Sequence, residues 1–242
     1  MAPLTEKGVL AQVSLSIIED HDSPRVREVH DLLLECLGEG NVEDFESFQG
    51  TVSPAADDAI VPIMLCATFD GRIQGIVLGA YLRNLGMGML LYSAVRGPFR
   101  GRGVYTSLRA GLLARLASEA ASSRAVGAGA TGKLDCVLSE LDARSRLGRK
   151  YVREWGAFVL PCDYEVPAAQ GLAPMRMDLL MQPISRHSPP TAEEIVAIVR
   201  EIYERVYCLE RADRSASFRR VVQSVRAPSA PGPTVAAIGG GR

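Results

Sequence analysis

The stretch Val95-Arg96-Gly97-Pro98-Phe99-Arg100-Gly101-Arg102-Gly103-Val104-Tyr105 carries the most information in this chain. It follows an apolar run, Met89 to Ala94, that predicts a buried strand, and it leads into residues 107–116, whose leucines keep helical spacing. Glycines in such a turn let the backbone approach a ligand, and the first amides of a helix point outward without partners. A strand, a glycine turn and a helix in this order predict a pyrophosphate site, toward which Arg100 and Arg102 add attraction.

Two common nucleotide-binding motifs do not fit this turn. The dinucleotide fingerprint G-x-G-x-x-G fails, because position 106 holds threonine rather than a third glycine. A phosphate-binding Walker A loop fails as well, since no Gly-Lys-Ser/Thr follows. A tight strand-to-helix connection with solvent-facing arginines stays open as the plain structural alternative.

Composition predicts a soluble protein of one or two domains. The chain has 242 residues, 47% hydrophobic and 23% charged, and a net charge of −1 from 27 basic and 28 acidic residues. This balance does not favour a nucleic-acid partner. No apolar run approaches the roughly 18 residues that span a bilayer, and the N-terminus does not resemble a secretory signal. The five cysteines form no C-x-x-C pair, so we expect a reduced, cytoplasmic protein without a metal site.

The hydrophobic pattern predicts a mixed α/β domain. Apolar or alternating runs predict strands at 12–19, 60–69, 73–82, 89–94, 134–141, 158–160 and 175–181. Helical spacing and capping residues predict helices at 24–36, 107–116 and 144–155, with a helical turn within 41–48. Asp70-Gly71 predicts a hairpin turn, and the small residues 121–131 predict a linker.

The C-terminal part of the chain is predicted to contain two helices and a tail. Thr191 and Glu194 form a capping box that begins a helix with an apolar stripe, and that stripe must be buried on the body or on a second subunit. The stripe consists of Ile195, Ile198, Val199, Ile202 and Val206. A second short helix is expected over 215–225, and the tail 227–242, rich in Pro, Gly and Ala, is expected to be mobile. We therefore expect three segments, with boundaries at 10–184, 185–226 and 227–242.

Residues 95–105 resemble the acyl-CoA pyrophosphate loop of the GNAT superfamily of N-acetyltransferases, whose pattern is Arg/Gln-x-x-Gly-x-Gly/Ala. Arg100 and Gly103 match its first and fourth positions, and Tyr105 departs from the small residue at the sixth. The order of elements over residues 10–184 agrees. The resemblance implies a GNAT fold, with a largely antiparallel sheet split at the fourth strand, and acetyl-CoA as co-substrate, with no metal. The residues implied to bind acetyl-CoA are Ala94, Val95, Arg100, Gly101, Arg102, Gly103, Val104, Tyr105 and Thr106.

The resemblance also implies direct transfer of acetyl to the primary amine of a small molecule or peptide, with a backbone N–H near Ser93 to Val95 stabilising the oxyanion. The family often has a thiolate-protonating tyrosine four residues before a Gly-Phe pair. Tyr151 lies five before Gly156, so a buried structural tyrosine remains the alternative. Glu140, near the end of the fifth strand, is our candidate base, with a solvated strand-end carboxylate as its alternative. Tyr92 is a third polar candidate.

The sequence gives one indication of the acceptor substrate. Glu39, Glu43, Asp44 and Glu46 crowd the segment after the first helix, and such an acidic rim attracts a cationic amine. A solvated acidic face accounts for the same residues. Two other functions stay open: a non-catalytic acyl-CoA-binding or scaffold protein whose C-terminal helix docks a partner, and a transferase for longer acyl chains.

Overall fold

The computed structural model describes residues 13–53, 59–123, 132–167 and 173–226. Its main sheet has seven strands in the order β1-β2-β3-β4-β5-β9-β6, in which all neighbours are antiparallel except the parallel pair β4 and β5. These strands are β1 (Ser14–Ile17), β2 (Ile60–Phe69), β3 (Arg72–Leu82), β4 (Met87–Val95), β5 (Cys136–Leu141), β6 (Phe158–Val159) and β9 (Asp178–Pro183). A separate two-stranded sheet pairs β7 (Glu165–Val166) with β8 (Met175–Arg176).

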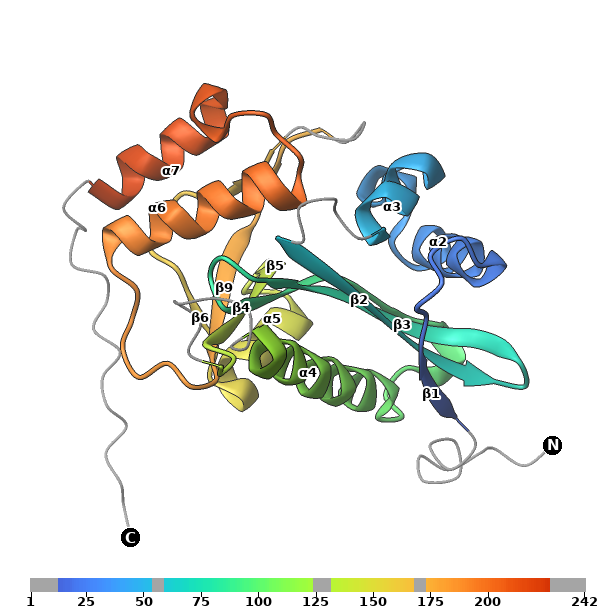
Figure 1. The fold of residues 1–242 in the computed structure, drawn as a ribbon. Helices are drawn as coiled ribbons and strands as arrows, with labels where there is room; N and C mark the ends of the chain where they lie inside the picture. The colour runs from blue at the N-terminus through green and yellow to red at the C-terminus, as the bar shows by residue number, and fades with distance from the viewer. Residues whose placement is uncertain (1–12, 54–58, 124–131, 168–172, 227–242) are drawn as a thin grey trace, which may run out of the picture.

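Helices cover both faces of the main sheet (Figure 1). They are α2 (Pro24–Leu37), α3 (Phe45–Val52), α4 (Val104–Ser123), α5 (Arg146–Trp155), α6 (Ala192–Glu201) and α7 (Ala216–Arg226). Helices α2 and α3 lie over the β1–β4 half of one face, and α6 and α7 lie over the β5–β9 half of that same face. Helices α4 and α5 cover the opposite face. The mixed α/β architecture predicted from the sequence is therefore confirmed.

Two strand glycines allow α4 to pack closely on the sheet. A Cβ atom at Gly79 would lie 2.8 Å from Leu112 Cδ1 and 2.9 Å from the carbonyl oxygen of Met89, and one at Gly88 would lie 2.6 Å from Leu116 Cδ1. These distances are well inside van der Waals contact. The leucines of α4 therefore occupy the space that strand side chains would otherwise fill, which fixes the position of the glycine loop that precedes this helix.

Strands β4 and β5 separate along their length. They pair at Gly88–Val137, Met89–Leu138 and Leu90–Ser139, and no pair follows. On its other side, β4 pairs Leu90 with Gly79 and Tyr92 with Leu78, so Leu91 is the extra residue of a β-bulge. A bulge bends its strand and increases the local twist. The bend at Leu91 carries the second half of β4 away from β5, and the predicted split at the fourth strand is confirmed.

The C-terminal helices pack against the chain's own sheet. Ile195, Ile198, Val199 and Ile202 are at most 1% exposed and share one hydrophobic cluster with Leu138, Leu179 and Met181 of the sheet. The predicted capping box of Thr191 and Glu194 is present. Of the two alternatives for the apolar stripe, the structure shows burial on the body, so this stripe is not available as a dimer surface.

Some element boundaries differ from the sequence predictions. Helix α4 begins three residues before the predicted start and extends into the predicted linker, of which 124–131 lie outside the described residues. The predicted strand 175–181 is divided into β8 and β9, and β7 was not predicted. The ends of the chain, with the tail 227–242 and the boundary at residue 10, also lie outside the described residues. No helix in the described part of the chain is both long and apolar enough to cross a membrane.

Candidate active site

The glycine loop joins β4 to α4 and presents backbone amides at the helix start. Gly101 and Gly103 have φ of +72° and +81°, which side-chain-bearing residues rarely adopt. The amide of Ser107 donates to the carbonyl of Gly103 at 3.0 Å, which is the first hydrogen bond of the helical ladder. The amides of residues 104–106 precede that bond and are directed out of the helix end, where the helix dipole favours an anion.

The arginines of the loop differ in their contacts. Arg100 folds back, and its Nε donates to the carbonyl oxygen of Val95 at 2.7 Å, which closes the loop against the end of β4. Arg96 pairs instead with Glu35 on α2 and donates to the carbonyl of Ile73 at 3.2 Å. Both guanidinium groups are therefore held by neighbouring elements, Arg100 against the end of β4 and Arg96 against α2 and β3.

Tyr151 belongs to α5 and packs on the face of the sheet that α4 and α5 cover. It is 2% exposed, and its hydroxyl lies 2.7 Å from the hydroxyl of Tyr105. Burial and this neighbouring hydroxyl raise the pKa of Tyr105, and a hydrogen bond with Ser93 of β4 opposes the shift. The sixth loop position thus directs its side chain into the body toward Tyr151. Through Tyr105, Tyr151 is connected to Ser93 in the separated part of β4.

A cavity of about 290 Å³ lies where β4 and β5 have separated. Its wall comes from α2, α3 and the segment between them, from β4 and β5, from the β7–β8 pair and the residues beside it, and from the turn after α6. The lining residues are Leu37, Asn41, Glu43, Thr51, Leu90, Leu91, Tyr92, Ser93, Glu140, Leu141, Val166, Ala173, Met175, Met177, Val206 and Tyr207. The wall is mostly apolar, with two carboxylates, as is common for small-molecule sites.

Glu140 projects from the end of β5 into this cavity. One carboxylate oxygen accepts a hydrogen bond from the hydroxyl of Tyr164, and the other accepts one from Tyr207 at 2.6 Å. Burial raises the pKa of Glu140, and the two tyrosine hydrogen bonds act in the opposite direction because they stabilise the ionised form. A carboxylate with a raised pKa in a small-molecule cavity is suited to accept a proton.

Glu43 is the second carboxylate of the cavity and is 2% exposed. It accepts a hydrogen bond from the hydroxyl of Tyr92. His30 of α2 contacts the carbonyl oxygen of Glu43 through Nε2 at 2.8 Å and so fixes this turn. Burial raises the pKa of Tyr92, and the charges of Glu43 and Glu140 raise it further. The hydroxyl of Tyr92 is therefore bonded to one carboxylate of the cavity and is influenced by the charge of the other.

The four residues of the predicted acidic rim, Glu39, Glu43, Asp44 and Glu46, have different positions in the structure. Glu43 alone among these four residues lines the cavity. Asp44 is the N-cap of α3 and accepts from the amide of Ser47 at 3.0 Å. Glu39 and Glu46 are exposed.

The structure does not bring the two predicted catalytic residues into contact. Along β5, Leu138 belongs to the cluster under α6 and Val137 to the cluster under α4, so Glu140 faces α6. Tyr151 belongs to the α4 cluster and is not among the described residues that line the cavity. Both assignments remain predictions. Sequence reasoning missed Tyr207, whose only signal was its place four residues beyond Tyr203, at the end of the helix with the apolar stripe.

Comparison with solved structures gives the fold family. The ribosomal-protein-S18-alanine N-acetyltransferase of Escherichia coli is 12% identical; the match covers 73% of this chain and 96% of that one, with a TM-score of 0.51. A putative acetyltransferase of the GNAT family from Bacteroides thetaiotaomicron is also 12% identical; its match covers 81% and 99%, with a TM-score of 0.56. No protein-family model matches the sequence, and no curated protein matches it significantly. Similarity at this level of identity concerns the fold alone, and the fold of this chain is that of the GNAT acetyltransferases.

Proposed function

We propose that this chain is an acyl-CoA-dependent N-acetyltransferase that moves the acetyl group of acetyl-CoA directly to the primary amine of a small molecule or peptide. One observation carries the proposal: the glycine loop and the carboxylate-containing cavity adjoin the same separated segment of β4. A thioester held by the loop and extended along that segment would bring its acyl end to the cavity. The GNAT fold supports this arrangement.

The loop would bind the CoA diphosphate through backbone amides and charge. The glycine turn and the amides of residues 104–106 supply donors, and Arg100 and Arg102 supply long-range attraction. The backbone at Ala94 and Val95 would pair with the pantetheine arm. An amide between Ser93 and Val95 would then stabilise the oxyanion that forms on the acyl carbonyl.

Transfer needs three proton movements. Glu140 accepts a proton from the ammonium, directly or through water, and the neutral nitrogen attacks the acyl carbon. The C–S bond then breaks, and the departing thiolate takes a proton from Tyr151, which is connected to β4 through the hydroxyl of Tyr105. The acylated nitrogen gives up its second proton to water, and the Tyr151 phenolate takes a proton back from water. Burial raises the pKa of Cys136 and of Cys162 to about 12. These two thiols are therefore poor nucleophiles at neutral pH, which supports direct transfer without an acyl-cysteine.

We also propose that residues 10–184 form the transferase unit and 185–226 an extension of it, and that the protein is cytoplasmic. A homodimer stays a prediction, and its interface would have to lie away from the buried stripe of α6.

Two alternatives keep specific support. A non-catalytic acyl-CoA-binding or scaffold protein would account for the tyrosine at the sixth loop position and the absence of Tyr151 from the described cavity wall. A transferase for longer acyl chains would use the apolar lining of the cavity. Release of free thiol, measured on a panel of amines with acyl-CoAs of increasing length, distinguishes all three.

Calorimetry with acetyl-CoA tests the loop. Gly103→Val should abolish measurable binding, because valine disfavours a φ of +81° and the amides would lose their direction. Gly50→Val is the matched control, since a Cβ at this α3 position meets nothing within 4 Å and its φ is ordinary. Equal affinity of wild type and Gly103→Val would overturn the proposed role of the loop.

A further inference from the structure

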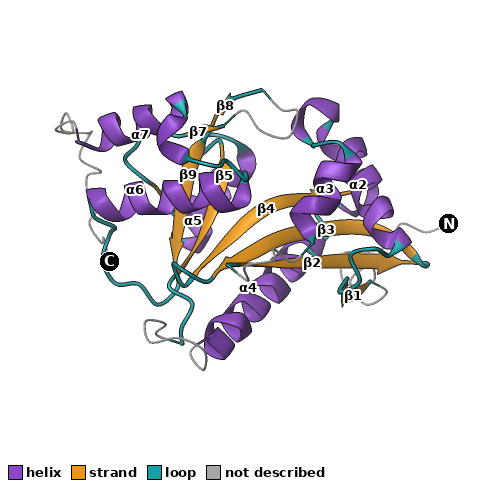
Figure 2. Cartoon of the chain, turned by 45° about the horizontal axis from the view of Figure 1, so that its top comes forward, coloured by secondary structure: helices purple, strands orange, loops and turns teal. Residues whose placement is uncertain are grey.

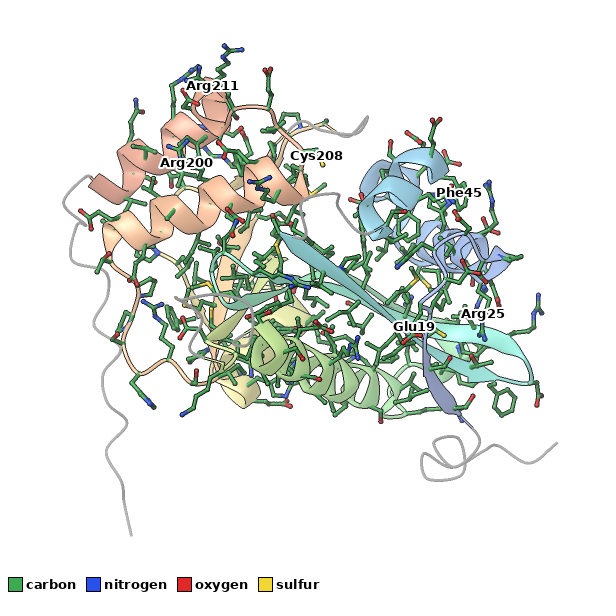
Figure 3. The ribbon with its side chains drawn as sticks, in the orientation of Figure 1. Glu19, Arg25, Phe45, Arg200, Cys208 and Arg211 are labelled. Atoms are coloured by element: carbon green, nitrogen blue, oxygen red, sulfur yellow. The ribbon has the colours of Figure 1, made fainter. Side chains whose placement is uncertain are left out.

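The end of α6 has two backbone irregularities that flank one side chain. Residues Ile202–Val206 form a π turn, and Cys208 has a φ of +53°, a conformation that residues other than glycine rarely adopt. Figure 3 labels Cys208 at the end of α6 that lies toward α3. Single π turns within helices and left-handed residues both cost energy and are concentrated at functional sites. Tyr207 stands between them.

These irregularities place Tyr207 in the cavity wall. Its hydroxyl donates to Glu140 at 2.6 Å, and Val206 beside it also lines the cavity. One turn earlier, the Tyr203 hydroxyl donates to the carbonyl oxygen of Glu165 on β7 instead. The Glu165 carboxylate in turn accepts from Ser217 and Arg220 of α7. The C-terminal helices are thus anchored to β7, and the helix end is held where Tyr207 reaches Glu140.

The remaining wall restricts what the cavity can bind. Apart from Glu43 and Glu140 with their tyrosines, much of the lining consists of leucine, valine and methionine side chains. An apolar wall favours a ligand whose carbon skeleton is apolar. A second charged group on the ligand would find no partner there, and its burial would cost free energy. A carboxylate buried as deeply as Glu43, in contrast, gains from a cation that enters beside it.

We propose that the acceptor is a small amine with an apolar body and one ammonium group, bound in this cavity beside Glu43 and Glu140, and that Tyr207 of the C-terminal extension is a positioning residue for Glu140. The acceptor class rests on the proposed function. The binding preference and the role of Tyr207 can be measured without turnover.

Calorimetry on the full chain, alone and with saturating CoA, tests the ligand class. 2-Phenylethylamine should bind at least about tenfold more tightly than its neutral analogue 2-phenylethanol, because only the amine offers charge-assisted hydrogen bonds. It should also bind more tightly than spermidine or an alanine-initiated tetrapeptide. Glu43→Gln should lower the affinity for 2-phenylethylamine by about tenfold and leave the affinity for 2-phenylethanol unchanged. Glu39→Gln, an exposed neighbour, should change neither.

Carboxyl NMR titration of Glu140 tests the positioning role. Tyr164 and Tyr207 hydrogen-bond to this carboxylate, the charge of Glu140 acts on Tyr92 and Tyr203, and Glu43 lines the same cavity. Tyr207→Phe should raise the titration midpoint, because the ionised form loses a hydrogen bond. Tyr81→Phe is the matched control: it also loses the hydroxyl of a buried tyrosine, but one in the cluster under α4 on the opposite face of the sheet, and it should leave the midpoint in place.

Three results would overturn the inference: 2-phenylethylamine binding no more tightly than 2-phenylethanol, tighter binding of spermidine or the peptide, or equal Glu140 midpoints in wild type and Tyr207→Phe. The proposed function fails separately. If no amine releases thiol, the transferase is refuted, whereas the amine preference of the cavity is decided by the calorimetry alone.

Discussion

The hydroxyl of Tyr207 lies 2.6 Å from Oε2 of Glu140 and connects the turn after α6 to the end of β5. Tyr164, which precedes β7, reaches the other oxygen of the same carboxylate. These hydrogen bonds connect the end of β5 with the segment before β7 and the turn after α6. They lie beside the split in the sheet, on the face where α6 covers β5 and β9 (Figure 2). This relationship makes the C-terminal helices part of the candidate site as well as of the core.

Replacing Glu140 by glutamine should lower kcat/KM by roughly 10²- to 10⁴-fold, the usual contribution of a general base. In the wild type, kcat/KM should fall at low pH along a limb set by Glu140, and burial places this limb above the carboxyl's ordinary pKa of 4.5. The limb should be absent in the variant. pH–rate profiles with acetyl-CoA and 2-phenylethylamine check this. An unchanged limb in Glu140→Gln would assign the base to another group.

The same substitution should have a pH-dependent effect on stability. Folding raises the pKa of Glu140, so its contribution to stability is fully present below the unfolded pKa and is lost as the pH rises through the folded one. Glutamine cannot ionise. The melting temperature of Glu140→Gln, relative to wild type, should therefore increase from pH 4.5 to pH 8. Exposed Glu39→Gln should show no such trend, and a parallel trend in both variants would argue against a buried Glu140 charge.

Tyr151→Phe should lower kcat and leave the affinity for acetyl-CoA nearly unchanged, the pattern of an interaction made mainly in the transition state. Because its hydroxyl is bonded to that of Tyr105, Tyr105→Phe should lower kcat as well. Tyr81→Phe is the matched control, since Tyr81 is 1% exposed and lies in the same hydrophobic cluster. Steady-state kinetics and calorimetry separate the two quantities. Wild-type kcat in Tyr151→Phe would require another acid.

The sequence predicted the local elements better than the contacts between them. Alternation and helical spacing predicted the strands and most helices, because these patterns reflect which face of an element is buried. The predicted start of α4 is three residues too late. The first turn of the helix contains no leucine, and it begins with the hydrogen bond from the amide of Ser107 to the carbonyl of Gly103. Strand β7, with two residues, is too short to show a period.

The candidate site could be predicted only in part for a related reason. Arg100 and the loop glycines lie together in the sequence, so their pattern was visible. Tyr207 meets Glu140 across 67 residues, and the π turn that directs it leaves no mark in the hydrophobic pattern. Tyr151 lies one residue out of position for the family motif, and the sequence did not show that its hydroxyl would face Tyr105 on the far side of the sheet from Glu140.

Substitution at Gly79 tests the close packing that fixes the glycine loop. Gly79→Ala should reduce the free energy of unfolding by about 1–3 kcal/mol, because its Cβ would lie 2.9 Å from the carbonyl oxygen of Met89 and 2.8 Å from Leu112. The backbone oxygen belongs to a paired strand and cannot move freely. Gly50→Ala, with nothing within 4 Å on a helix, should instead stabilise by about 0.5–1 kcal/mol. Urea denaturation measures both, and equal midpoints for the two variants would contradict the observed contact between β3 and α4.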